Sequence, residues 1–114
     1  RLWAFGKLIG NTDMHHGNLS FISSHGRPYR LAPAYDMLPM GFAPSTGGAI
    51  VNALRPASLP DVIRGDIWHD ALDLADRFLV IARRCDRFSA NFAPCLEVLH
   101  RHLDEARSRI ARLG

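Results

Sequence analysis

Two stretches in the second half of the chain repeat their apolar residues with the period of an α-helix. In the first stretch, after Asp66, apolar residues recur at steps of three and four, at Ile67, Ala71, Leu74, Phe78, Ile81 and Cys85. Further apolar residues widen this stripe, namely Leu72, Ala75, Leu79 and Ala82. A stripe of this width predicts a long helix that is largely buried.

The last stretch has a more regular pattern. Charged residues fill many of the positions between its apolar residues. The apolar residues recur at alternating steps of four and three, at Phe92, Leu96, Leu99, Leu103, Ala106, Ile110 and Leu113. Pro94 fits only the first turn of such a helix. We expect an amphipathic helix that covers its own domain rather than a coiled coil with a second chain. His100 and His102 are expected on its surface.

The first half of the chain predicts shorter elements. Leu2, Phe5, Leu8 and Ile9 share one helical face, and the Gly and Asn that follow are a stop signal. Residues 19–22 and 29–31 alternate like strands around a turn, which predicts a β-hairpin. Residues 38–60, rich in Pro and Gly, predict irregular structure. The expected fold is mainly α with a small β-hairpin, in a single domain over residues 1–114.

Composition excludes several classes of protein. An apolar share of 47% and a charged share of 22% are typical of a globular domain, and no apolar run is long enough to span a bilayer. The formal charge of +3 comes from Arg residues interleaved with Asp, which indicates nucleic-acid binding only weakly. Cys85 and Cys95 have neither CxxC nor zinc spacing, which favours reduced thiols and a cytoplasmic location.

Three oxygen-bearing side chains stand where a phosphoryl-transfer site would need them. Asp13 and Asn18 belong to Asn11-Thr12-Asp13-Met14-His15-His16-Gly17-Asn18, and Asp36 follows the hairpin in Ala32-Pro33-Ala34-Tyr35-Asp36-Met37. The five-residue step lets Asp13 and Asn18 face one cavity, and the hairpin returns Asp36 beside them. Asp13 would orient a hydroxyl and take its proton, while Asn18 and Asp36 offer hard ligands for Mg²⁺ and so for the phosphates of ATP.

This string resembles the HipA family of serine/threonine-type kinases, whose larger lobe carries N-x-D-x-H-x-x-N and then A/T-P-x-Y-D. The resemblance is most specific over residues 1–40. It implies that Asp13 is the catalytic Asp and that Asn18 and Asp36 hold the metal and cofactor, Mg²⁺ and ATP. His15, two residues after Asp13, is expected to contact the transferred phosphate. Met37 after Asp36 favours this family over the phosphatidylinositol kinases, which place Phe-Gly there.

The resemblance also places the chain within a larger protein. It is similar to part of the C-terminal lobe of a HipA-like kinase, including the branch described as helix-turn-helix regulators, and the N-terminal lobe is expected upstream of Arg1. The chain by itself is therefore expected to be inactive, and the parent to phosphorylate a protein substrate. The alternative is a DNA-binding regulator or toxin–antitoxin component that uses a kinase-like scaffold, with an antitoxin-type partner and operator DNA. No membrane partner is expected.

Overall fold

The computed structural model describes residues 1–49 and 53–114. Its elements are α1 (Leu2–Leu8), η1 (His16–Asn18), β1 (Phe21–Ile22), β2 (Arg30–Leu31), η2 (Met40–Phe42), α2 (Gly65–Arg84), η3 (Ala90–Phe92) and α3 (Ala93–Ile110). The expected architecture, mainly helical with one small hairpin, is confirmed. None of the helices formed by the described residues is long and apolar enough to cross a membrane.

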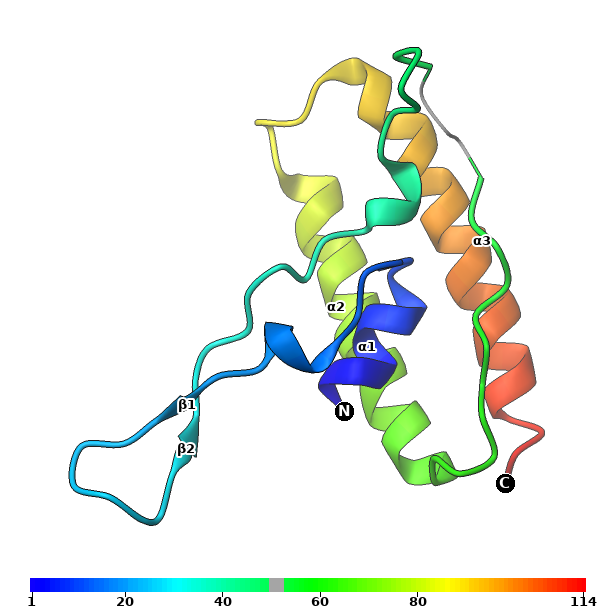
Figure 1. The fold of residues 1–114 in the computed structure, drawn as a ribbon. Helices are drawn as coiled ribbons and strands as arrows, with labels where there is room; N and C mark the ends of the chain where they lie inside the picture. The colour runs from blue at the N-terminus through cyan, green and yellow to red at the C-terminus, as the bar shows by residue number, and fades with distance from the viewer. Residues whose placement is uncertain (50–52) are drawn as a thin grey trace.

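The helices α1, α2 and α3 pack together into a helical body (Figure 1). The helices α2 and α3 run antiparallel side by side, and the short α1 lies against α2. The indole of Trp68 on α2 is wholly buried, with its ring centroid 6.1 Å from that of Trp3 on α1. Because α1 is anchored in this core, the loop that follows it starts from a fixed point.

Burial of α2 differs from the expected stripe. The buried side chains are Trp68, Ala71, Leu72, Ala75, Leu79 and Ala82. Leu74 and Ile81, placed on the stripe by their spacing, are 40% and 69% exposed. The apolar residues of this helix cover more than one face, and contact with α1 and α3 selects which of them are buried.

The expected helix at the end of the chain is confirmed as α3, with Pro94 in its first turn. Its buried residues include Leu99, Leu103 and Ile110, as the spacing predicts. The surface position expected for His102 is wrong, because its side chain is buried between the helices and only 7% of the residue is exposed. Leu113 lies beyond the helix and is 40% exposed.

The hairpin projects away from the helical body (Figure 1). Its strands pair antiparallel, with Phe21 opposite Leu31 and Ile22 opposite Arg30, and all four side chains are exposed. The segment 38–60 contains the short η2 and otherwise irregular chain, as expected, although its residues 50–52 lie outside the description. A hydrogen bond of 2.8 Å from the Gly41 N–H to the Gly10 carbonyl ties the chain after the hairpin to the end of α1.

Candidate functional site

The loop with Asp13 begins where α1 ends. Gly10 has a φ of +78°, a left-handed conformation that most residues with a side chain avoid, and a Cβ there would lie 2.7 Å from Leu54 Cδ2. The Asn11 N–H then bonds back to the Gly6 carbonyl at 2.8 Å. This turn directs the chain off the helix and buries Asn11, which is 3% exposed.

The side chain of Asn11 joins the two halves of the motif. Its Oδ1 accepts a hydrogen bond of 2.8 Å from the Asp13 N–H. Its Nδ2 donates a hydrogen bond of 2.7 Å to the Asp36 carbonyl. One amide therefore links the loop that carries Asp13 to the turn that carries Asp36.

Asn18 and Asp36 are in direct contact. The short helix η1 places Asn18 with only 6% exposed, and its Nδ2 lies 3.4 Å from Asp36 Oδ2. The Oδ1 atom of Asn18 accepts a hydrogen bond of 3.2 Å from the His15 N–H. An amide oxygen has two lone pairs, so Oδ1 retains one for another ligand.

Asp13 and His15 lie next to each other at the surface of the same loop. Asp13 Oδ2 is 3.8 Å from His15 Nε2, and the two side chains are 67% and 56% exposed. Both side chains are open to solvent, whereas Asn18 is buried. The link between Asp13 and Asp36 passes through Asn11.

A second tie closes the base of the hairpin. The Tyr35 hydroxyl donates a short hydrogen bond to the Gly17 carbonyl, and it lies 3.3 Å from Ser20 Oγ. The Ala32 N–H donates to the Ser20 carbonyl at 2.8 Å, which continues the strand pairing toward the site. Tyr35 therefore holds the chain just before Asp36 against η1.

The donor set of Asn18 and Asp36 fits Mg²⁺. This ion prefers carboxylate, amide and water oxygens, and it commonly takes one or two protein ligands together with substrate phosphates. The contact of 3.4 Å joins Asp36 Oδ2 to the Nδ2 atom of Asn18, and the oxygen that Asn18 could offer to Mg²⁺ is the Oδ1 atom of the same amide. Among residues 1–49 and 53–114, no group of three or more His, Cys, Asp or Glu side chains could hold a metal ion.

The site is an open surface. A cavity of about 420 Å³ borders the loop, and its lining includes Lys7, Asn11, Thr12 and Arg55. An apolar groove of about 620 Å³ separates the hairpin from α1 and α2, with a lining that includes Phe5, Leu31, Leu74 and Ile81. Asp13, His15, Asn18 and Asp36 line neither of these two cavities.

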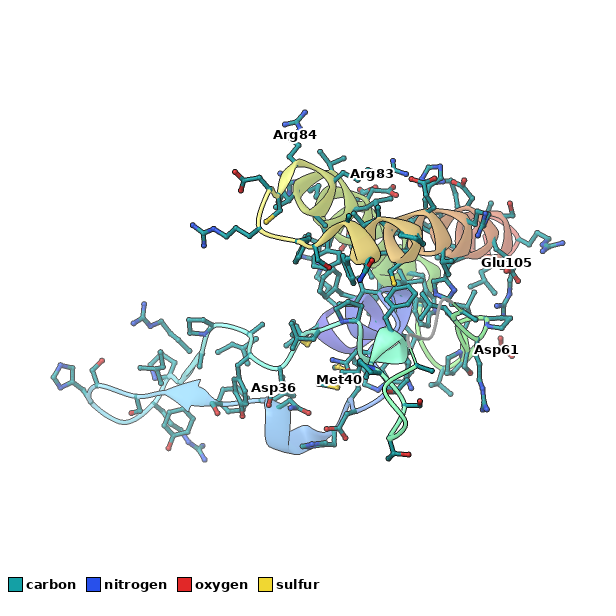
Figure 2. All side chains as sticks on the ribbon, turned by 90° about the horizontal axis from the view of Figure 1, so that it is seen from above. Asp36, Met40, Asp61, Arg83, Arg84 and Glu105 are labelled. Carbon is teal, nitrogen blue, oxygen red and sulfur yellow. The ribbon has the colours of Figure 1, made fainter. Side chains whose placement is uncertain are left out.

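The basic end of α2 lies apart from the site. Figure 2 shows Asp36 at the root of the hairpin beside η1, with Arg83 and Arg84 on the opposite side of the molecule. Arg83 pairs with Glu97 on α3 at 3.0 Å. Arg83 therefore belongs to the surface of the helical body, as does Arg84, and neither side chain contributes charge to the candidate site.

Sequence reasoning assigned no role to two residues that build the site. Asn11 and Tyr35 both belong to the motif strings, but only Asp13, His15, Asn18 and Asp36 received chemical roles. The one feature of the sequence that could have indicated a role for Asn11 and Tyr35 is that both lie within the two motif strings. The physical reason for it, two hydrogen bonds made across the loop by each side chain, is visible only in three dimensions.

Comparison with known proteins agrees with the motif. A family profile described as the HipA-like C-terminal domain matches residues 1–106. The protein named Toxin YjjJ from Escherichia coli (strain K12) is 36% identical over 113 residues, which cover 99% of this chain and 25% of that protein. The chain thus spans about a quarter of the length of that curated relative. No solved structure gives a significant match. The profile match covers most of the chain, and the chain therefore belongs to the family of HipA-like C-terminal domains.

Proposed function

We propose that the intact parent protein transfers the γ-phosphoryl group of ATP to a hydroxyl of a protein substrate, and that residues 1–114 are part of the C-terminal lobe of its kinase fold. The observation that carries the proposal is the contact between Asn18 and Asp36, with Asp13 tied to the same Asp36 through Asn11. The family match and the motif support it.

In this proposal Asp13 is the catalytic residue. Its carboxylate orients the attacking hydroxyl and accepts the proton as the bond to phosphorus forms. The exposed position of this carboxylate suits a substrate as large as a protein. His15, 3.8 Å from Asp13, donates a hydrogen bond to an oxygen of the transferred group.

Asn18 and Asp36 are the residues that would hold Mg²⁺ and, with it, the nucleotide. When bound, the ion neutralises charge on the phosphates. This chain holds the Asn18 amide next to the Asp36 carboxylate before any ligand binds. Binding therefore does not have to include the entropy cost of bringing these two groups together. The open surface around these side chains leaves the remaining wall of a nucleotide site to the rest of the parent protein.

A second candidate is a regulatory role in a toxin–antitoxin pair, with an antitoxin-type partner and operator DNA as ligands. It is favoured by the 36% identity to a protein named as a toxin. DNA binding whose affinity falls steeply with salt, in an intact protein without affinity for ATP, would favour this candidate. The two roles are compatible within one protein.

The proposal is tested by substituting Asp13→Asn in the intact protein and following transfer of γ-phosphate from ATP to protein. Loss of a general base costs about a hundredfold to ten-thousandfold in rate, so we expect transfer to fall by at least about a hundredfold. Asp61→Asn is the matched control, because it makes the same change at an exposed position. Equal transfer by wild type and Asp13→Asn would refute the assignment.

A further inference from the structure

We infer that Asn11 is a positioning residue whose side-chain amide sets the placement of Asp36 relative to Asp13. The inference rests on the proposed function and adds to it a residue that touches neither the nucleotide nor the substrate hydroxyl. It is drawn from burial, two hydrogen bonds and the backbone conformation of Asp36.

The side chain of Asn11 must accept one hydrogen bond and donate another, which a carboxamide does at any pH. The group accepts from the Asp13 N–H at one end and donates to the Asp36 carbonyl at the other, at 2.8 and 2.7 Å. A carboxylate can accept but cannot donate, and an alanine can do neither. With 3% of the residue exposed, water has little access to replace a lost partner.

The backbone of Asp36 explains why such a tie is needed. Its φ is 54°, in the left-handed region that residues with a side chain adopt only uncommonly. Asn11 holds the carbonyl of Asp36, and Asn18 lies against its carboxylate. Because both polar groups of Asp36 are held from the Asp13 loop, the direction of the carboxylate is fixed by that loop.

Asn11 is one step removed from the chemistry. Its side-chain oxygen and nitrogen are both occupied by backbone groups, so it acts on Asp13 and Asp36 through their main chains. Loss of the tie should therefore lower kcat and raise the Mg²⁺ concentration needed for half-maximal activity. It should leave the KM for the protein substrate unchanged. Residues that orient a metal ligand typically contribute tenfold to hundredfold in affinity or activity.

Two substitutions in the intact protein separate the two hydrogen bonds. Asn11→Asp retains the acceptor for the Asp13 N–H and loses the donor to the Asp36 carbonyl, whereas Asn11→Ala loses both. Asn91→Asp is the matched control at an exposed position. We expect Asn11→Asp to lower kcat about tenfold to a hundredfold, with the control unchanged.

The pH profile distinguishes positioning from general damage to the fold. A protonated carboxyl at position 11 regains a donor, so the kcat of Asn11→Asp relative to wild type should rise as the pH falls. A low ratio that stays constant across the pH range would overturn the inference. So would wild-type kcat and Mg²⁺ dependence in Asn11→Ala.

Hydrogen–deuterium exchange at the Asp13 amide gives a readout that does not depend on activity. We expect faster exchange in Asn11→Ala and near-wild-type exchange in Asn11→Asp, since only the first loses the acceptor. If wild type neither binds Mg²⁺ and ATP nor transfers phosphate, the proposed function fails, and exchange still decides whether Asn11 joins the two segments. Unchanged exchange in Asn11→Ala would overturn the inference by itself.

Discussion

Three polar side chains are buried among the described residues, and they have different roles. Asn11 and Asn18 are satisfied by contacts within the candidate site, where they organise Asp13 and Asp36. His102 lies on α3, and its Nε2 is buried without a hydrogen-bond partner. Buried polar atoms are usually paired, and His102 Nε2 shares its unpaired state with the indole nitrogen of Trp68 among the described residues.

The surroundings of His102 hold its imidazole in the neutral form. Burial lowers its pKa below the ordinary value of 6.5, which outweighs the opposite effects of Glu105 and of a hydrogen bond with the backbone of Leu8; Arg109 also lowers it. The unfolded chain therefore binds a proton at a higher pH than the folded chain does. Stability contributed by neutral His102 is present above pH 6.5 and is lost as the pH falls below it.

Replacing this histidine should therefore change how stability depends on pH. We expect His102→Gln to show a shallower loss of unfolding free energy than wild type between about pH 7 and about pH 5. His100→Gln, at a side chain 45% exposed on the same helix, is the control and should retain the wild-type slope. Urea denaturation at several pH values measures this, and equal slopes for wild type and His102→Gln would contradict the prediction.

At the residue scale, the motif spacing predicted that Asn18 and Asp36 lie close together, but it did not identify the residues that hold them in place. The motif led us to expect that the side chains of Asp13, Asn18 and Asp36 lie near one another. The contact between Asn18 and Asp36 agrees with this expectation. Asn11 could not be assigned a role, because its two partners lie 2 and 25 residues away along the chain. A long-range hydrogen bond leaves no periodic signature in a sequence.

At the element scale, α2 shows the limit of periodicity. Its apolar residues are numerous enough to define several overlapping stripes, and spacing alone does not choose among them. Contacts with α1 and α3 bury Leu79 to 4% exposure and leave Ile81, two residues later, 69% exposed. The hairpin and α3 were easier to predict, since each has one dominant pattern.

The orientation of α2 can be tested with two neighbouring substitutions in this chain. Leu79→Ala should lower the free energy of unfolding by about 2–5 kcal/mol, because it leaves a cavity in the core. Ile81→Ala should change it by less than about 1 kcal/mol, because that side chain is mostly in solvent. Urea denaturation gives both values, and a larger loss for Ile81→Ala would mean that the helix is rotated from the orientation described.

At the scale of the whole molecule, the helical body and the hairpin should differ in local stability. The body buries the apolar core, whereas the hairpin projects from it with all four strand side chains exposed (Figure 1). A two-stranded ribbon without a buried face is marginal in water. Its stability must come from its base, where Tyr35 and Ser20 tie it to η1.

Hydrogen–deuterium exchange of this chain would measure that difference. We expect the slowest exchange at amides in the middle of α2 and α3, and exchange in residues 21–31 faster by at least about a hundredfold, since opening the hairpin exposes little apolar surface. Amides in α1 should be intermediate, because the helix is short but anchored in the core. Protection of the hairpin equal to that of α3 would contradict this ranking.

The sequence by itself determined the presence of the helices and the hairpin, the types of side chain at the candidate site, and their order along the chain. These properties depend on local spacing, which reflects the geometry of helices and turns. Tertiary structure decided which face of α2 is buried, why His102 is enclosed, and how Asn11 joins Asp13 to Asp36. Those outcomes depend on contacts between segments far apart in the chain, where the packing of each element is set by the shape of the others.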